Sequence, residues 1–389
     1  MLNSGDEAPK YIAHILTEYL GHPSNWIYTQ IKYTQRYIPY VLAQRVVNLD
    51  HYPLERIFVS RKSGKSSGSP SFAERIVRRL GFLPRVDFQC FSSALERYPP
   101  LLLQAHFGWD GYFSLGLKKK HGLPQVTRFY GYDVGILPRI PLWRRRYQRL
   151  FGEGDLFIVE GTNMKSLLEN AGCPSGKIVV HHLGVNLDQI KYEPRKPQPK
   201  ALRVLIAASF KEKKGIEYAL KAIARAGKEM PDMNIHTTII GDGVLKKTLH
   251  DLAGELGILG AIAWTGYQPH GYFLEELYKA DLFLSPSVTA SDGDTEGGAP
   301  VAIIEAGASG LPVISTTHAD IPEVVLNGCT GFLAAERNVE SLAESICRLA
   351  RDPAMRMEFG RRARAHIEAN YECVRQGKLL SDIYAKYEK

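Results

Sequence analysis

Apolar and polar segments alternate regularly over the second half of the chain. Short apolar runs are each followed by a longer stretch in which apolar residues recur at helical spacing. Strands are predicted at 203–209, 234–241, 261–266, 282–287, 312–316 and 331–335, with helices between them. Alternation of this kind is typical of a parallel sheet wound with helices. The second half is therefore predicted to be a doubly wound α/β domain.

The first half shows the same pattern less regularly. The run at 101–107 is almost continuously apolar, as expected for a parallel strand that is covered on both faces. After a turn at 21–23, Ser24 and Asn25 lead into a predicted helix. Strands are predicted at 11–16, 37–46, 56–60, 101–107, 124–129, 155–160 and 177–184. A second α/β domain is therefore expected.

The chain of 389 residues exceeds what one hydrophobic core usually supports, so two domains are expected. Three prolines and alternating charges mark 192–200 as the linker. We therefore predict an N-terminal domain over 1–193 and a C-terminal domain over 194–365. Residues 366–389 are predicted to form a final helix.

The most informative stretch is 285–317, where a polar, acidic loop follows a short apolar run. Proline suits the first turn of a helix, so Pro300 marks the start of a helix over 301–309. The glycines ahead of it let a ligand approach the backbone closely, and free N–H groups at the helix start favour an anion such as a phosphate. This stretch is the predicted ligand site.

Glu305 lies inside this otherwise apolar helix. A buried carboxylate is costly unless another group donates hydrogen bonds to it. A sugar or ribose diol is one such partner, and neighbouring backbone or a lysine is the alternative. Because Glu305 follows an acidic, glycine-rich loop at the end of a strand, the functional interpretation is favoured.

Composition indicates an anionic partner without identifying it. The net charge of +8 suits nucleotide sugars, anionic lipids or nucleic acid, but no nucleic-acid-binding signature accompanies it. Five scattered cysteines without a CxxC pair argue against a disulfide framework or a zinc site and fit a reducing cytosol. The N-terminal sequence is not that of a signal peptide, and no apolar run approaches the roughly 18 residues of a membrane-spanning helix.

The run from Glu305 to Val313 resembles the signature of the retaining glycosyltransferases of family four, and the chain looks like their bacterial exopolysaccharide and cell-surface glycan members. That signature is a glutamate, seven residues and a second glutamate, followed by small residues. The resemblance implies the GT-B architecture of two facing Rossmann-like domains, with a final helix that returns to the N-terminal domain. It also implies that Glu305 holds a nucleotide ribose, that the first glutamate meets the transferred sugar, and that loop amides hold the diphosphate.

The first glutamate has two candidates, because eight residues, 297–304, separate Glu296 from Glu305. Either the loop carries a one-residue bulge and Glu296 fills the catalytic position, or Gly297 occupies it. We predict Glu296 as the catalytic residue. The loop residues predicted to line the donor site with it are Gly297, Gly298, Ala299, Pro300 and Val301.

Lys214 follows the first strand of the second half and matches a lysine of the family pattern. The resemblance implies that it binds the diphosphate, and we also predict a catalytic role for it. Ser209 stands where the family has an arginine, so the donor site is expected to differ here. Either diphosphate binding is weaker as a result, or Lys211 or another basic group compensates.

Two further turns complete the predicted donor site. Gly241-Asp242-Gly243 follows the second strand of this half and resembles the glycine turn that borders the nucleotide in the family. Tyr267 follows the third strand, where the resemblance places the base. The identity of the base stays open.

Two consecutive strands of the first half end in polar, glycine-bearing turns, where open α/β sheets place ligands. These turns resemble the acceptor side of the family. His106 is predicted to assist proton movement or to bind a sugar hydroxyl, although a lone histidine at a strand end is often structural. Tyr130 stands where the family commonly has a second histidine. The residues predicted for the acceptor side are Ser24, Asn25, Trp109, Tyr130 and Asp133.

The segment 138–151 is the most basic of the chain and carries aromatic residues at helical spacing. One interpretation is an interfacial helix whose aromatics enter lipid headgroups while its arginines meet anionic lipids. The alternative is a surface helix that packs its apolar stripe on the sheet. Arg75, Arg78, Arg79 and Arg85 would extend the basic surface. The polar segment 61–71 is predicted to be a loop, either solvated or a flap over a site.

The family resemblance, together with these patterns, implies a nucleotide-sugar-dependent, retaining hexosyltransferase that acts on a glycan or lipid-linked acceptor in surface polysaccharide biosynthesis. A UDP- or GDP-sugar is the expected donor, and neither a metal nor another cofactor is expected. The alternatives are an inactive or regulatory nucleotide-sugar-binding protein of the same fold and, without a G-x-G-x-x-G turn to support it, an NAD-dependent oxidoreductase. The expected location is the cytoplasm, with association at the cytoplasmic face of an anionic membrane as an open alternative.

Overall fold

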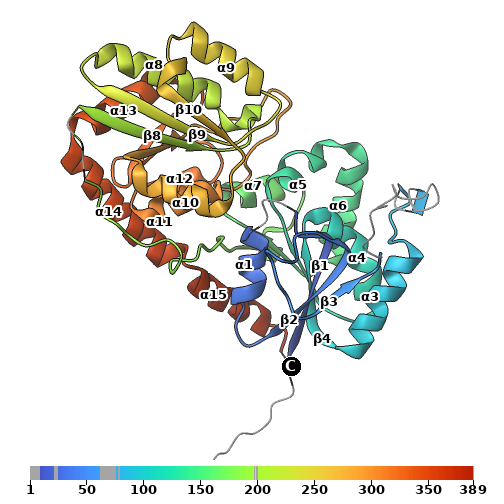
Figure 1. Cartoon of the computed structure of the whole chain (residues 1–389). Helices are drawn as coiled ribbons and strands as arrows, with labels where there is room; N and C mark the ends of the chain where they lie inside the picture. Colours follow the sequence, from blue (N-terminus) through green and yellow to red (C-terminus); the bar gives the residue numbers. More distant parts are fainter. Residues whose placement is uncertain are drawn as a thin grey trace, which may run out of the picture. The chain divides into compact units, whose positions relative to one another are not determined.

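The computed structural model describes residues 9–21, 25–61, 76–77, 79–196, 198 and 200–388. The chain divides into two compact units. Unit 1 contains Met1–Gly184 and Cys373–Lys389, and unit 2 contains Val185–Glu372. Each unit is a parallel sheet with helices on both faces (Figure 1).

The described residues of unit 1 form a seven-stranded parallel sheet in the order β3-β2-β1-β4-β5-β6-β7. Its strands are β1 (Tyr11–Tyr19), β2 (Ile38–Val46), β3 (Ile57–Val59), β4 (Pro100–His106), β5 (Gln125–Arg128), β6 (Leu156–Val159) and β7 (Ile178–Val180). Its helices are α1 (Asn25–Tyr33), α3 (Arg85–Arg97), α4 (Gly108–His121), α5 (Gly131–Gly135), η1 (Leu137–Arg139), α6 (Pro141–Glu153), α7 (Thr162–Asn170), η2 (Ser175–Lys177) and α15 (Cys373–Ala385).

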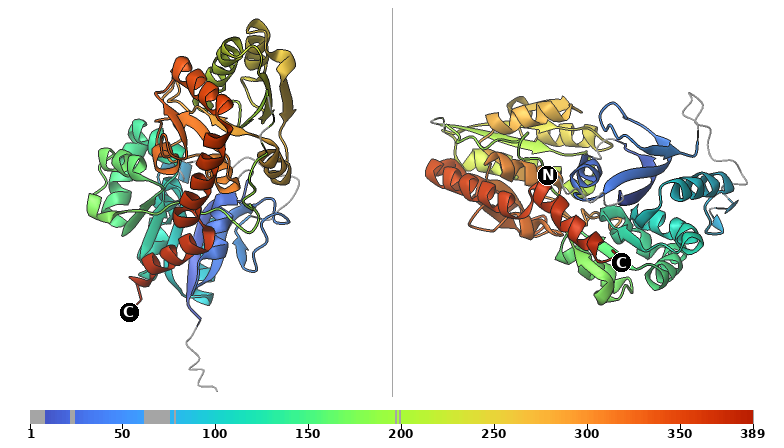
Figure 2. Two further views of the ribbon diagram at one scale, coloured as in Figure 1. Left: turned by 90° about the vertical axis from the view of Figure 1, so that its left-hand side faces the viewer. Right: turned by 90° about the horizontal axis from the view of Figure 1, so that it is seen from below.

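Adjacent residues of β4 pack on opposite faces of the unit 1 sheet. Leu103 packs in the cluster beneath α3 and α4, whereas Leu102 packs against α15. Helix α15 lies beside α1 (Figure 2), and Tyr384 donates a hydrogen bond from its hydroxyl to Gln104 Oε1 at 3.1 Å. The last helix therefore covers one face of the unit that begins the chain, as the family resemblance implied.

The described residues of unit 2 form a six-stranded parallel sheet in the order β10-β9-β8-β11-β12-β13. Its strands are β8 (Ala201–Ala207), β9 (Asn234–Ile240), β10 (Ile262–Gly266), β11 (Leu282–Ser285), β12 (Val313–Thr316) and β13 (Gly331–Ala334). Its helices are η3 (Glu212–Lys214), α8 (Ile216–Glu229), α9 (Lys246–Glu255), η4 (Leu259–Ala261), α10 (His270–Lys279), α11 (Val301–Ser309), α12 (Ile321–Val324), α13 (Val339–Arg351) and α14 (Pro353–Asn370).

Strand β8 shows how the unit 2 sheet is buried on both sides. Val204 and Ile206 pack under α8 and α13, while Leu205 packs against α10 and α11 on the opposite face. Figure 1 shows these two layers of helices. A sheet covered in this way needs apolar residues at successive positions, which is why its strands read as continuous apolar runs. The six strands predicted for the second half are confirmed.

The unit boundaries fall after residues 184 and 372, whereas the sequence placed them after 193 and 365. Residues 185–196 associate with unit 2 because Ile190 is buried in its core. Arg195 also donates hydrogen bonds to the Leu277 carbonyl and to Ser309 Oγ, each at 3.0 Å. The described part of the predicted linker up to residue 196 is thus held against unit 2.

Candidate active site

The candidate site lies at the carboxyl edge of the unit 2 sheet, where the strand order reverses between β8 and β11. Open parallel sheets bind ligands at such a switch point. Two segments leave the sheet here, residues 208–215 and residues 286–300, which we call the acidic loop. They approach so closely that a Cβ at Gly215, whose φ is 64°, would lie 1.8 Å from the Pro286 carbonyl oxygen. Only glycine fits that position.

Lys214 and Glu296 form an ion pair between these two segments. Lys214 Nζ lies 2.7 Å from Glu296 Oε2, and Ser287 Oγ donates a hydrogen bond to Glu296 Oε1 at 2.8 Å. The side chain of Glu296 is 6% exposed and that of Lys214 is 19% exposed. The structure thus brings together two residues predicted to be catalytic.

Glu296 remains ionised although it is buried. Burial would raise the pKa of its carboxyl group, but the charges of Lys214 and Lys213 and the Ser287 hydrogen bond hold the pKa below its ordinary value. Glu296 is therefore an anion at neutral pH. A fixed anion of this kind stabilises positive charge that develops on a bound molecule.

The charged residues beside Lys214 hold the outer part of the acidic loop. Lys213 Nζ binds Asp294 Oδ1 at 3.1 Å and the Thr295 carbonyl at 3.0 Å. Glu212 accepts hydrogen bonds from the backbone and the hydroxyl of Ser291, at 2.8 and 2.7 Å. The lysine-rich turn is therefore built into the loop.

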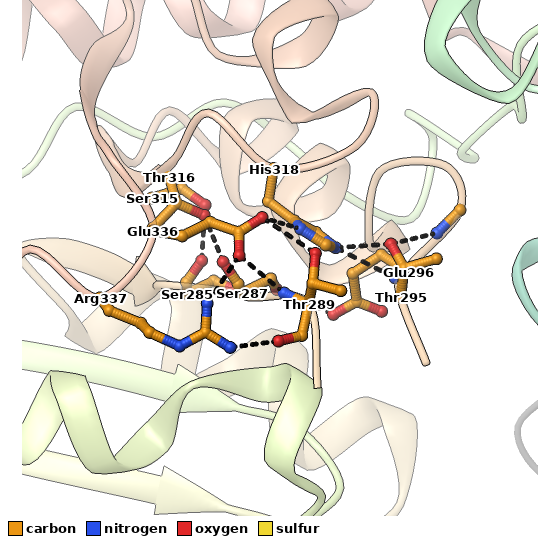
Figure 3. A network of polar contacts seen from close by, with 11 residues as sticks. Ser285, Ser287, Thr289, Thr295, Glu296, Ser315, Thr316, His318, Glu336 and Arg337 are labelled. Carbon is orange, nitrogen blue, oxygen red and sulfur yellow. Dashed lines mark hydrogen bonds and ion pairs between the residues drawn. The ribbon is translucent and has the colours of Figure 1, made fainter. Parts of the chain in front are cut away.

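A second set of contacts holds the acidic loop from the opposite side (Figure 3). His318 follows β12, and its Nε2 lies 2.9 Å from Thr295 Oγ1 and accepts the Glu296 backbone N–H at 3.2 Å. His318 Nδ1 lies 2.7 Å from Oε1 of Glu336, which follows β13. Glu336 also accepts the Thr289 backbone N–H at 2.8 Å. We call these two side chains the His318–Glu336 bridge.

The sequence interpretation did not identify this bridge. Its signal is positional, because each residue stands two places after the end of one of two adjacent parallel strands. Such positions meet at the same edge of the sheet. The pairing itself needs the strand order, which the sequence alone does not provide.

Helix α11 begins directly after the acidic loop, as predicted. Pro300 caps it with φ −56° and ψ 130°, and Gly297 adopts a left-handed φ of 77°. Among the described residues, no hydrogen bond is made by the backbone N–H of Gly298, Ala299 or Val301. Three donors at a helix start are thus available to an anion.

Glu305 lies one turn into α11 and is buried, as expected. Its partner is neither backbone nor a lysine: Oε1 lies 2.7 Å from Nε2 of His270, the first residue of α10. This hydrogen bond raises the pKa of His270, against the opposing effect of burial. His270 is half-exposed and was missed by the sequence interpretation, because 35 positions separate the two residues.

The Gly241-Asp242-Gly243 turn packs on the backbone that follows β8. A Cβ at Gly241, whose φ is 139°, would lie 1.9 Å from the Ala208 carbonyl oxygen. Asp242 uses its oxygens locally, accepting from the Gly243 N–H and from Lys246 Nζ, each at 2.7 Å. The turn therefore lies beside half-buried Ser209. Tyr267, after β10, exposes 72% of its surface.

In unit 1, His106 lies at the end of β4 in a buried polar chain. Its Nε2 is 3.1 Å from His14 Nδ1, and its Nδ1 is 2.9 Å from the Tyr130 hydroxyl, which also accepts from Gln30 Nε2 at 3.4 Å. Burial lowers the pKa of His14 to about 3 and that of His106 well below its usual range. Both imidazoles are therefore neutral at physiological pH. The catalytic role predicted for His106 stays a prediction.

Asp133 is fully buried and joins two turns of unit 1. Its carboxyl group accepts the Gly108 N–H at 2.7 Å and the Tyr130 N–H at 2.6 Å. Burial raises the pKa of Asp133 to about 8, although these two hydrogen bonds oppose the change. Trp109 is half-buried and stacks on Phe107 with ring centroids 4.4 Å apart. Ser24 and the side chain of Asn25 lie outside the described residues.

Helix α6 divides the predicted basic segment between two environments. Tyr147, Leu150 and Phe151 pack in the core of unit 1, as the surface-helix interpretation expects. Ile140 and Leu142, at its start, are exposed. Residues 62–75 and Arg78, which include most of the predicted loop and two arginines of the predicted basic surface, lie outside the described residues.

The described residues contain no group of three or more His, Cys, Asp or Glu side chains arranged to hold a metal ion. No helix among them has both the length and the apolar character needed to cross a membrane.

Comparisons with known proteins match both units. The family described as glycosyl transferases group 1 matches residues 189–366. The amylovoran biosynthesis glycosyltransferase AmsK of Erwinia amylovora is 33% identical over 268 residues, which are 68% of this chain and 65% of AmsK. The putative colanic acid biosynthesis glycosyltransferase WcaL of Escherichia coli K12 is 32% identical over 270 residues, 69% of this chain and 66% of WcaL. The matches thus span slightly less than two thirds of these relatives.

Solved structures share the fold. Anabaena HepE in complex with UDP and glucose superposes with a TM-score of 0.73 at 16% identity, covering 96% of this chain and 99% of HepE. A glycosyltransferase from Rickettsia africae gives a TM-score of 0.76 at 17% identity, covering 98% and 99% of the two chains. The predicted GT-B fold class is confirmed.

Proposed function

We propose that the chain is a nucleotide-sugar-dependent, retaining glycosyltransferase of surface polysaccharide biosynthesis, a proposal supported by the match of residues 189–366 to the family described as glycosyl transferases group 1. The observation that carries this proposal is the Lys214–Glu296 pair at the switch point of the unit 2 sheet, beside backbone N–H groups at the start of α11 that have no acceptor in the described part of the chain. A cation and unpaired N–H groups suit a diphosphate, and a fixed carboxylate suits a sugar centre that becomes positively charged.

The proposed roles follow from what each group offers. The diphosphate binds the N–H groups of Gly298, Ala299 and Val301, and Lys214 neutralises charge as it leaves. Glu296 faces the transferred sugar and Glu305, positioned by His270, accepts hydrogen bonds from the ribose hydroxyls. Phosphate charge is thus balanced by protein groups, so the proposal includes no metal.

The nature of the donor is inferred from relatives. HepE has been solved with UDP and glucose, and a Corynebacterium glutamicum relative that is 28% identical is described as GDP-mannose-dependent. We therefore propose a UDP- or GDP-hexose as donor. AmsK and WcaL are described as enzymes of amylovoran and colanic acid biosynthesis, which supports a glycan or lipid-linked acceptor.

Unit 1 is proposed to meet the acceptor near an anionic membrane. The exposed residues Ile140 and Leu142 stand beside Arg144 and Arg145, which are also exposed. Arg146 donates a hydrogen bond to the Arg79 carbonyl at 2.9 Å, so α6 lies next to the segment that carries exposed Leu80 and Phe82. Apolar and basic side chains in one area suit a surface of anionic lipid headgroups.

Thermal unfolding in the presence of UDP, GDP, UDP-glucose, GDP-mannose and NAD tests the proposal. A ligand that binds only the folded chain stabilises it by about 2.7 kcal/mol at a hundred times its Kd. We expect a uridine or guanosine nucleotide to raise Tm, NAD to leave Tm unchanged, and Glu305→Gln to abolish the response. Glu276→Gln is the matched control, because it changes a carboxylate on α10 that pairs with Lys279. This variant should keep the rise in Tm that the nucleotide causes.

Two results would contradict the proposal. Stabilisation by NAD alone would favour the oxidoreductase alternative. A full response of the Glu305→Gln variant would show that the nucleotide binds elsewhere. Release of hexose from the stabilising nucleotide sugar, followed over time, separates an active enzyme from an inactive binding protein.

A further inference from the structure

His318 is almost completely buried beneath the acidic loop, with 2% of its surface exposed. It therefore contacts loop atoms and not a bound molecule. We propose that His318 is a positioning residue, which fixes the backbone of the acidic loop so that Glu296 and the amides after it take their binding arrangement. This inference deepens the proposed function and rests on it.

The hydrogen bonds determine which nitrogen of His318 carries its proton. The Glu296 backbone N–H can only donate, and it approaches Nε2 at 3.2 Å, so Nε2 presents a lone pair. The proton then resides on Nδ1, which donates to Glu336 Oε1 at 2.7 Å. A carboxylate behind an imidazole fixes its tautomer and ring orientation. Glu336 therefore keeps His318 in the form that the loop requires.

The same carboxylate holds the opposite end of the loop. Glu336 Oε2 accepts the Thr289 N–H at 2.8 Å, and Oε1 lies 3.2 Å from the Thr289 hydroxyl. Through the bridge, residue 289 is joined to residues 295–296, and the intervening turn is closed. Glu336 thus holds Thr289 directly and Thr295 through His318 (Figure 3).

Fixing the Glu296 backbone has two consequences for the site. It directs the Glu296 side chain to Lys214 and Ser287, and it leaves the N–H groups of Gly298 and Ala299 without an acceptor among the described residues. Catalytic groups lose about a hundredfold in rate when misplaced by about 1 Å. A residue that never touches the donor therefore influences how the donor is held.

Two substitutions test the roles of the two imidazole nitrogens of His318 separately. His318→Asn keeps a donor near the Nδ1 position, for Glu336, but removes the acceptor for the Glu296 N–H. His318→Gln places a carbonyl oxygen near the Nε2 position and keeps that acceptor. Hydrogen exchange by mass spectrometry is measured on peptides within 287–300 in the free protein, with peptides of unit 1 as the reference for correct folding.

Exchange in the acidic loop should be at least about fivefold faster in His318→Asn, and within about twofold of the wild type in His318→Gln, because a protected amide exchanges at the rate at which its hydrogen bond opens. The kcat/KM for UDP-glucose or GDP-mannose, whichever the wild type uses, should fall about tenfold in His318→Asn and recover in His318→Gln.

Equal loop exchange in all three proteins would overturn the proposal, as would loss of activity to the same extent in both variants. Failure of the proposed function has a different signature. If the wild type neither binds UDP or GDP nor uses either sugar nucleotide, that function is lost, whereas the exchange rates in the free protein still decide whether His318 fixes the loop.

Discussion

The carboxyl edges of the two sheets carry polar clusters in opposite electrostatic states. In unit 2, Glu296 is buried but faces Lys214, and its pKa lies below the ordinary value. In unit 1, His106 and Asp133 are buried without a counter-ion among the contacts of the described residues, and burial lowers the pKa of the histidine and raises that of the aspartate to about 8. Burial thus favours the neutral form of a titratable side chain unless an opposite charge lies beside it.

The contrast fits the roles that we propose for the two units, in which unit 2 binds the donor and unit 1 meets the acceptor. A phosphate-bearing donor needs fixed charges, which unit 2 supplies in pairs. In unit 1, the chain from His14 through His106 to Tyr130 consists of neutral hydrogen-bonding groups that are almost completely buried. Substitutions that change charge in one unit and hydrogen bonding in the other test this distinction.

The largest effect is expected from Lys214→Met, which leaves Glu296 buried without its nearest cation. Removing one partner of a buried ion pair costs about 3 kcal/mol of unfolding free energy. Urea unfolding at pH 7.5 measures the loss, and the UDP or GDP response should disappear with it. A loss below about 1 kcal/mol would show that water screens this pair.

A matched surface pair provides the control. Lys221 Nζ lies 2.5 Å from Glu217 Oε1 on α8, with the two side chains 37% and 50% exposed. Lys221→Met breaks the same kind of ion pair at a solvent-exposed position, so the loss of unfolding free energy should stay within about 0.5 kcal/mol. The difference between the two lysine variants isolates the effect of burial.

Asp133→Asn should produce the next largest effect and a distinctive pH dependence. The variant turns an amide N–H₂ toward a backbone N–H and loses about 2 kcal/mol at pH 5. Because the folded-state pKa of Asp133 is raised, the folded wild type binds more protons than the unfolded chain between pH 4 and 8. The unfolding free energy of the wild type therefore falls as pH rises through this window. The loss of unfolding free energy caused by Asp133→Asn, which does not titrate, becomes smaller over the same range.

Urea unfolding of both proteins at pH 5, 6.5 and 8 measures this change. The difference in unfolding free energy should narrow with a limiting slope of about 1.4 kcal/mol per pH unit. Groups that both proteins share cancel in the difference. Parallel pH profiles would mean that Asp133 is ionised in the folded protein and stabilised by the amides of Gly108 and Tyr130.

The smallest effect is expected from Tyr130→Phe, which removes the hydroxyl between His106 and Gln30. A buried polar atom left unpaired costs about 1.5 kcal/mol. Nucleotide-induced stabilisation should be unchanged, because this chain lies wholly in unit 1. A weakened nucleotide response would mean that the polar chain of unit 1 also serves donor binding.

Sequence patterning predicted the fold well because both sheets are parallel and buried on both faces. Strands such as Leu282–Ser285 are buried on both faces, so they stand out in the sequence as short apolar runs. Proline and glycine mark the two ends of α11. The unit boundaries were harder to predict. Prolines indicated a linker, but Ile190 and Arg195 fasten that segment to unit 2, and nothing local in the sequence shows such contacts.

For the candidate site, the sequence indicated the charged groups but not their partners. Glu296 and Lys214 stood out by composition and resemblance, whereas His270 and the His318–Glu336 bridge did not. Each of these partners comes from a different strand end, and which strand ends are adjacent depends on a strand order that local patterns leave open. Hydrogen-bond complementarity at a sheet edge is therefore visible only once the chain is folded.

The position of α15 governs the order in which the protein can be completed during synthesis. Unit 2 is a continuous stretch, so all of its residues are synthesised before those of α15. The part of the unit 1 sheet formed by Ile12, Leu102, Val126 and Ile158 lacks its packing partners until Leu380, Ile383 and Tyr384 are made. The half that begins first is thus finished last, and an N-terminal fragment that stops before α15 would expose an apolar sheet face to water and to other chains.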